Sequence, residues 1–140
     1  MKRMMVLFLS ALVFLSCVSA LYSLSPDDTV ERWAASLERK DLDALMTTYW
    51  PDASLVIPGD EDLEKAWNGS DEIRELQSGS TGNPDVEMVV KLDSSQRNMN
   101  GNSAIYIIDV ESGGAIIVNT LELEKRGNEW RIVYQTLAFK

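Results

Sequence analysis

The chain has 140 residues, which is enough for one domain, and its 45% hydrophobic and 25% charged content is ordinary for a folded globular protein. Its formal net charge is −9, and its basic residues are scattered rather than interleaved with aromatic ones, so we expect no nucleic-acid partner. The absence of histidine excludes histidine-based acid–base catalysis and histidine-containing metal sites. We therefore predict no metal and no cofactor.

The first 20 residues are typical of a signal for export. Two basic residues precede an apolar run over 4–15, and small residues follow, with Val18 and Ala20 where a signal peptidase prefers them. The apolar run is shorter than the roughly 20 residues that a membrane-spanning helix needs. We expect a signal peptide over 1–20 and a mature periplasmic or secreted domain over 21–140, with 11 basic and 22 acidic residues and a net charge near −11.

Cys17 leaves a second interpretation of this segment open. Residues 14–17 are similar to a loose bacterial lipobox, in which Cys17 would carry a lipid and become the first mature residue. Otherwise Cys17 is removed with the signal. In both cases membrane contact is expected only through the signal or a lipid, and the folded domain has no disulfide framework.

Two amphipathic helices are predicted first. Ser25 and Pro26 form a helix start, and Asp41 can cap a second helix that Pro51 ends. The apolar positions recur at helical spacing. They are Val30, Trp33, Ala34 and Leu37 in the first helix, and Leu42, Leu45, Met46 and Tyr49 in the second.

Short elements follow the helices. Residues 53–57 predict a strand, and residues 60–65 predict a loop or a single helical turn. Ser70 begins a third, short helix, and Gly79 stands where a C-terminal cap is expected.

The second half of the chain has the alternation of strands. Four strands are predicted over 86–92, 104–110, 115–124 and 129–139, with a polar connection over 94–103. Short glycine-containing links between the last three predict antiparallel hairpins. We therefore expect an α+β fold with about three N-terminal helices on one face of an antiparallel sheet, whose second apolar face needs a partner or a cavity.

Three segments resemble a known family. They are Asp41–Leu55, with Tyr49-x-x-Asp52-Ala53, then Gly69–Arg74, with Gly69-x-x-x-Ile73, and Trp130–Val133. This pattern resembles the SnoaL-like branch of the nuclear transport factor 2-like (NTF2-like) superfamily. The resemblance implies a strongly curved sheet wrapped around a long helix, forming a cone whose mouth receives a small apolar molecule. The family includes ketosteroid isomerases, polyketide cyclases, dehydratases, and non-enzymatic binding or assembly domains.

The resemblance also allows the catalytic residues of ketosteroid isomerases to be compared with this chain position by position. The general base of ketosteroid isomerases falls at Ile57 of this chain, their helix-one tyrosine at Trp33, and their second acid near Asn119. Because the base and the tyrosine are both replaced, we do not expect steroid-type isomerisation.

Two carboxylates are left as candidates for chemistry. Asp52 lies beside aromatic residues in the family motif, but we favour a turn residue that caps neighbouring amides. Asp109 shares a strand face with Ile105 and Ile107, so it is either a pocket acid, and a weak catalytic candidate, or the solvent-exposed end of its strand.

Polar tips on apolar strand faces are what a small-molecule pocket requires. Asn119 lies on an apolar face of its strand. Tyr134 and Thr136 alternate in step with Trp130 and Ile132, so we expect all four on one face of the last strand. The alternative is that Tyr134 and Thr136 are ordinary strand formers on a wet or dimer-facing surface. The predicted pocket residues are Trp33, Tyr49, Ile57, Asn119, Tyr134 and Thr136.

Three functions fit these observations. The first is a non-catalytic domain that binds a small apolar or amphipathic molecule. The second is a dehydratase, cyclase or isomerase that uses Asp109 as base and Asn119 or Tyr134 to stabilise an enolate-like oxygen. The third, compatible with either, is a homodimeric interaction domain that associates through the outer face of the sheet.

Overall fold

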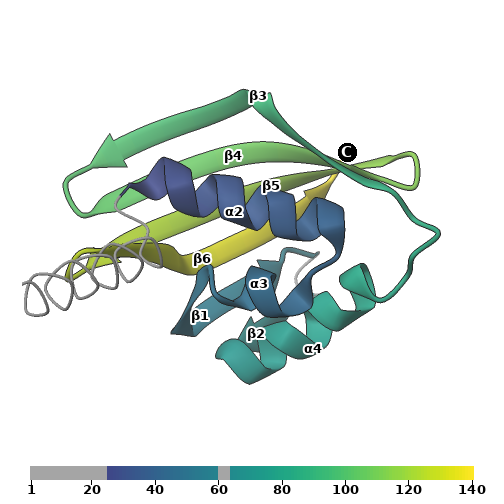
Figure 1. The fold of residues 1–140 in the computed structure, drawn as a ribbon, viewed down its shortest axis with the longest axis horizontal. Helices are drawn as coiled ribbons and strands as arrows, with labels where there is room; N and C mark the ends of the chain where they lie inside the picture. The colour runs from purple at the N-terminus through teal and green to yellow at the C-terminus, as the bar shows by residue number, and fades with distance from the viewer. Residues whose placement is uncertain (1–24, 60–63) are drawn as a thin grey trace, which may run out of the picture.

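The computed structural model of the chain describes residues 25–59 and 64–140. The predicted signal peptide and Cys17 lie outside the described residues. The described part has three helices and one six-stranded sheet, so the predicted α+β fold is confirmed (Figure 1). No helix in the described ranges is long and apolar enough to cross a membrane.

The three helices begin at the predicted residues, but the second and third end elsewhere than predicted. They are α2 (Pro26–Arg39), α3 (Leu42–Met46) and α4 (Ser70–Thr81). The Ser25 hydroxyl accepts a hydrogen bond from the backbone N–H of Asp28, at 3.2 Å, and Asp41 caps α3 in the same way. Helix α3 stops before Tyr49, which instead begins a strand, and α4 continues through Gly79 to a cap at Gly82.

The sheet has the strand order β2-β1-β6-β5-β4-β3. Its strands are β1 (Tyr49–Ile57), β2 (Lys65–Asn68), β3 (Met88–Asn100), β4 (Ser103–Ser112), β5 (Ala115–Arg126) and β6 (Glu129–Phe139). The β1–β6 pair is parallel, and every other pair is antiparallel, including the predicted hairpins. The first and last strands along the chain are thus neighbours in the interior of the sheet.

Two strand assignments from the sequence were wrong. Strand β2 covers Lys65–Asn68, which the sequence did not predict as a strand, because pairing with β1 supplies its hydrogen bonds. Strand β3 includes most of the predicted polar connection over 94–103 and continues to Asn100. Ladder pairing satisfies backbone groups whatever the polarity of the side chains, so a polar sequence can extend a hairpin.

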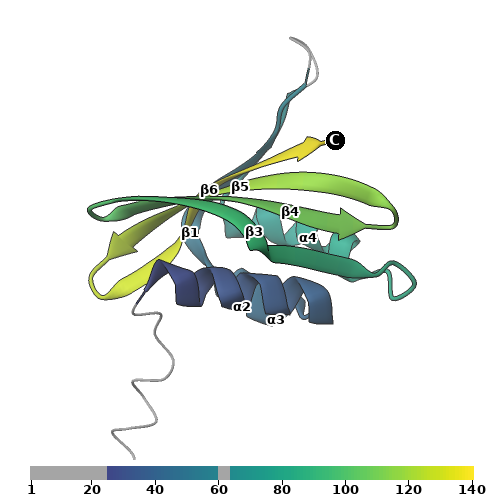
Figure 2. The ribbon, with the colours of Figure 1, turned by 90° about the horizontal axis from the view of Figure 1, so that it is seen from above.

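The sheet curves around helix α2. The register of β3 against β4 shifts between Lys91 and Gln96, and β3 bends there over α2 (Figure 2). Helix α2 lies along the concave face and buries Val30, Trp33 and Leu37 against the sheet. The core therefore fills the space between α2 and the concave face.

Polar contacts fix the N-terminal end of α2. The Thr29 hydroxyl donates to the backbone carbonyl of Trp130, at 2.6 Å, and Arg97 pairs with Asp27 at 2.7 Å. The Tyr106 hydroxyl also donates to Asp27, which holds the pKa of that carboxyl below its usual value. Strands β3, β4 and β6 are thus each joined to this end of the helix.

The start of α4 joins the helix to β1. The N–H of Gly69 donates to the carbonyl of Ala53, at 2.8 Å, and Ile73 is fully buried one turn later. Gly69 has φ +85° and ψ 160°, a region that only glycine occupies without strain. The motif residues Ala53, Gly69 and Ile73 therefore belong to one contact between helix and sheet.

We predict opposite effects for two glycine substitutions in this region. Gly69→Ala should lower the free energy of unfolding by about 1 to 3 kcal/mol, because its backbone conformation strains any side chain. Gly79→Ala, inside α4 with no atom within 4 Å of an added Cβ, should raise it by about 0.5 to 1 kcal/mol. Urea unfolding curves measure both, and equal effects would contradict the described geometry of Gly69.

Candidate functional site

A small cavity lies between the helices and the concave face of the sheet. It is lined by residues from the C-terminal halves of α2 and α4 and from β3, β4, β5 and β6. Its volume is about 40 Å³. The lining residues are Trp33, Leu37, Gln77, Ser80, Met88, Val110, Ile117, Asn119, Gln135 and Leu137. None of these side chains is ionisable, so the cavity is apolar with three amide groups and one hydroxyl.

A buried hydrogen-bond network forms one wall of the cavity. Its centre is the Tyr49 hydroxyl, which accepts from Trp33 Nε1 and from Gln77 Nε2, each at 3.2 Å. The same hydroxyl donates to Gln135 Oε1, and Gln135 Nε2 donates to Asn119 Oδ1 at 2.9 Å. Helices α2 and α4 are thereby connected to strands β1, β5 and β6 through side chains alone.

The network is electrically neutral. Burial raises the pKa of Tyr49 to about 12, so the phenol keeps its proton at physiological pH. The last donor, Asn119 Nδ2, bonds to the backbone carbonyl of Ile117 at 3.2 Å. Each amide therefore has a defined orientation, which suits recognition of a ligand and gives no general acid or base near neutral pH.

Three of the predicted pocket residues come together here. Trp33 and Asn119 line the cavity, and Tyr49 lies behind them in the hydrogen-bond network. Ile57 packs at the edge of the core, at the end of β1, and is not among the lining residues.

The side chains in the second half of strand β6 face the opposite sides of the sheet from those predicted. The register against β5 shifts, with Ile132 opposite Leu123 but Tyr134 opposite Glu122, so Val133 is an extra residue in the ladder. The bulge reverses the alternation that was extrapolated from Trp130 and Ile132. Gln135 consequently points inward, while Tyr134 is 38% exposed on the outer face, with Thr136 following the same parity.

Sequence reasoning did not identify Gln77 or Gln135. Gln77 lies two positions before Gly79, where the helix was predicted to end. The inward direction of Gln135 could not be predicted without knowing of the bulge in β6. A faint signal existed for Gln77, because it lies four residues after buried Ile73, on the same helix face.

Asp109 is not part of the cavity. Its carboxylate is paired with Lys140 Nζ, at 2.9 Å, on the outer face of β4. Asn119 is on the opposite face of the sheet, because it pairs with the buried neighbour Ile108. Asp109 and Asn119 are therefore separated by the sheet, whereas Tyr134, the other candidate oxyanion donor, lies on the outer face with Asp109 and outside the cavity.

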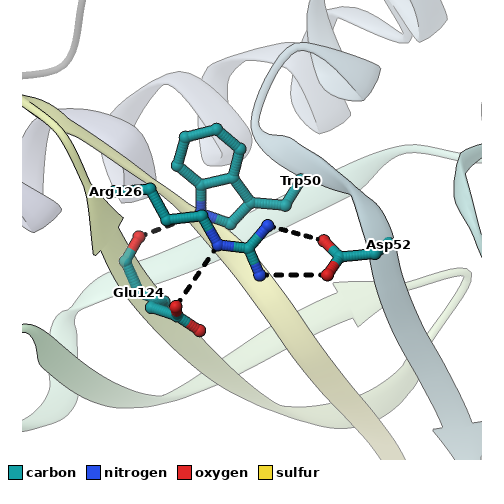
Figure 3. A network of polar contacts seen from close by, with 4 residues as sticks. All are labelled: Trp50, Asp52, Glu124 and Arg126. Carbon is teal, nitrogen blue, oxygen red and sulfur yellow. Dashed lines mark hydrogen bonds and ion pairs between the residues drawn. The ribbon is translucent and has the colours of Figure 1, made fainter.

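Asp52 also has a different environment from the one predicted. It lies within β1 rather than in a turn, and Arg126 donates two hydrogen bonds to it, at 2.8 and 3.1 Å (Figure 3). These hydrogen bonds hold the pKa of the Asp52 carboxyl below its usual value.

The Asp52 pair belongs to a surface cluster. The Arg126 guanidinium group lies over the Trp50 ring, 4.9 Å from its centre, and Trp50 Nε1 donates to the carbonyl of Glu124 (Figure 3). The Arg131 guanidinium group lies 5.0 Å from the centre of the same ring. This cluster connects β1 to the β5–β6 hairpin, and its cations are already paired. Over residues 25–59 and 64–140, no group of three or more acidic or cysteine side chains is arranged to hold a metal ion.

Comparison with known proteins supports the fold. No protein-family model matches this chain, and no curated protein matches it in sequence. The proposed calcium/calmodulin-dependent protein kinase type II association domain from Thiobacillus denitrificans ATCC 25259 is similar, with a TM-score of 0.69 and 17% identity over 83% of this chain and 95% of that one.

Two NTF2-like proteins of unknown function are also similar. The one from Shewanella baltica OS155 has a TM-score of 0.63 and 11% identity, over 91% of this chain and 96% of that one. The one from Silicibacter pomeroyi DSS-3 has a TM-score of 0.60 and 18% identity, over 93% and 98%. At these identities the likeness concerns the fold alone, and the fold is NTF2-like.

We predict that Tyr49→Phe lowers the free energy of unfolding by about 1 to 3 kcal/mol at neutral pH, because buried polar groups lose their partner. Raising the pH should reduce the difference in free energy of unfolding between the wild-type protein and Tyr49→Phe. The unfolded phenol ionises near pH 10 and the folded one near 12, so wild-type protein loses stability from Tyr49 over that interval and the variant does not.

Urea unfolding at a series of pH values checks this, and Tyr134→Phe, at an exposed tyrosine, is the matched control. The control should stay within about 0.5 kcal/mol of wild type. Equal losses for the two variants would contradict a central role for the Tyr49 hydroxyl.

Proposed function

We propose that this chain is an exported, non-catalytic binding domain that holds a small apolar or amphipathic molecule in this cavity. The observation that carries this proposal is the composition of the cavity, in which apolar walls surround three oriented amides and no ionisable side chain. Ligand sites typically combine mostly apolar walls with a few oriented polar groups.

The lack of ionisable groups weighs against the enzymatic alternative. A dehydratase, cyclase or isomerase needs a group that transfers a proton within hydrogen-bond reach of the substrate. Asp109 faces away from the cavity, and Tyr49 remains protonated until about pH 12. The amides alone would orient a bound molecule without transforming it.

Membership in the SnoaL-like branch and export are part of the proposal. The motif residues Tyr49, Ala53, Gly69 and Ile73 form the contacts of β1 with α2 and α4, which supports the branch assignment. Export is supported by the predicted signal over 1–20, whose removal would leave the whole of α2 in the mature protein. A lipid on Cys17 is the alternative form of the same proposal.

Native mass spectrometry of the mature protein purified gently from its own host tests the binding function. We expect a mass excess that disappears on denaturation, and the spectrum of the denatured protein also gives the mature N-terminus. Asn119→Leu should reduce the bound fraction, because it replaces a cavity amide, whereas Asn98→Leu on β3 is a control outside the cavity. A clean apo mass for wild-type protein would contradict the proposal.

A homodimer is a second candidate, favoured by the outer face of the sheet. Ile105, Ile107 and Tyr134 are 41%, 39% and 38% exposed there. The β4–β5–β6 ladder aligns Ile105 with Tyr134 through Glu122, so the three side chains share one surface. Exposed apolar side chains grouped in this way, with Glu122 between two of them, suit protein association. The similar structure from T. denitrificans is described as an association domain.

We predict that Ile107→Glu, combined with Tyr134→Glu, converts a dimer to a monomer, because it places charges in the centre of the apolar surface. Sedimentation velocity at several concentrations measures the mass. Met99→Glu is the matched control, since Met99 is 45% exposed but lies at the β3–β4 hairpin, paired with the inward-facing Ala104. A monomeric wild-type protein at high concentration would exclude the homodimer.

A further inference from the structure

The size of the cavity limits which part of a ligand can enter it. A volume of about 40 Å³ accommodates about three water-sized groups, whereas sites that enclose a whole drug-sized ligand measure roughly 300 Å³ or more. A head group of about three non-hydrogen atoms fits without rearrangement of the walls. The remainder of such a ligand must lie outside the cavity.

The polar atoms that face the cavity are both donors and acceptors. Gln77 uses one N–H on Tyr49, and its second N–H and its Oε1 have no partner among the described residues. The same is true of the second N–H of Asn119 and of the Ser80 hydroxyl. A head group that both donates and accepts hydrogen bonds, such as a carboxamide or an alcohol, matches this set.

An ionised head group has no counter-charge in the cavity. No cationic side chain is among the lining residues, and Lys140, directly after β6, is paired with Asp109 on the outer face. Burial of an unpaired carboxylate is far more costly than burial of a neutral amide that keeps its hydrogen bonds. The site therefore discriminates against charge.

An apolar path leads out of the cavity along β6. Leu137 lines the cavity, and Phe139 follows it on the same face of the strand, paired with Ile117 of β5. Phe139 is 66% exposed, although it is a large apolar side chain. An alkyl chain that lies over Ile117, Leu137 and Phe139 would cover this exposed surface.

We infer that the ligand is an uncharged amphiphile whose hydrogen-bonding head enters the amide cavity and whose apolar tail leaves over Leu137 and Phe139. This inference rests on the proposed binding function and specifies the chemical class and orientation of the ligand. Fatty amides and alcohols belong to the class, and fatty acids in their ionised form do not.

Titration of the mature protein with octanamide and with octanoate at neutral pH tests the inference. The two probes have the same tail and heads of nearly equal size, and they differ in charge. NMR of the isotope-labelled protein follows the side-chain amides of Gln77, Asn119 and Gln135 and gives both the location and the Kd. We expect octanamide to bind at least about tenfold more tightly, the equivalent of about 1.4 kcal/mol. Equal or tighter binding of octanoate, or no binding of octanamide, would overturn the inference.

Variants of the protein test the head-group contacts and the tail contacts of the ligand separately. Gln77→Leu should reduce the preference for octanamide to within about threefold, and Phe139→Ser should weaken octanamide binding without changing the preference. Ser80→Ala is a second variant of the head-group contacts, and because Ser80 is exposed its replacement leaves the core intact. Glu75→Gln, at another exposed position of α4, is the control. Unchanged affinity in Ser80→Ala and Phe139→Ser together would contradict this orientation.

Failure of this inference is distinguishable from failure of the proposed function. A host-derived ligand that is released on denaturation and proves to be an acid would preserve the binding function and overturn the inference. A clean apo mass together with no binding of either probe would overturn both.

Discussion

The hydroxyl of Tyr49 joins two helices, α2 and α4, to the sheet through one shared group. It receives hydrogen bonds from Trp33 of α2 and Gln77 of α4 and gives one to Gln135 of β6. A buried phenol with three partners is stable only if all three elements are correctly placed, because an unpaired buried polar group costs about 1 to 3 kcal/mol. The curvature of the sheet, the position of α4 and the orientation of the cavity amides therefore depend on one another.

This network also determines the chemistry of the interior. All of its members are neutral, and the carboxylates considered as candidates, Asp52 and Asp109, are paired with cations at the surface. Among residues 25–59 and 64–140 no carboxylate is buried, so the negative charge of this part lies at its surface, where it favours solubility. An interior of oriented amides and apolar walls is suited to selecting neutral molecules, which supports the proposed binding function over the proposed alternative of proton-transfer catalysis.

The two faces of the sheet support two compatible roles. The concave face carries the amide cavity, and the convex face carries Ile105, Ile107 and Tyr134. The bulge at Val133 assigns residues of β6 to these faces, since it directs Gln135 inward and Tyr134 outward. A ligand in the cavity and a second subunit on the convex face would not compete for the same surface.

The sequence by itself determined the α+β class, the helix caps at Ser25 and Asp41, the three hairpin strands and the inward positions of Trp33 and Asn119. These features depend on local spacing, which the 3.6-residue and 2-residue periods express directly. Only the tertiary structure decided that Tyr49 belongs to β1 rather than α3, that β3 continues through a polar segment, and that Gln135 rather than Tyr134 faces the cavity. Strand pairing decides these features, because partners distant in the sequence satisfy the backbone and one extra residue in a ladder reverses the facing of every side chain after it.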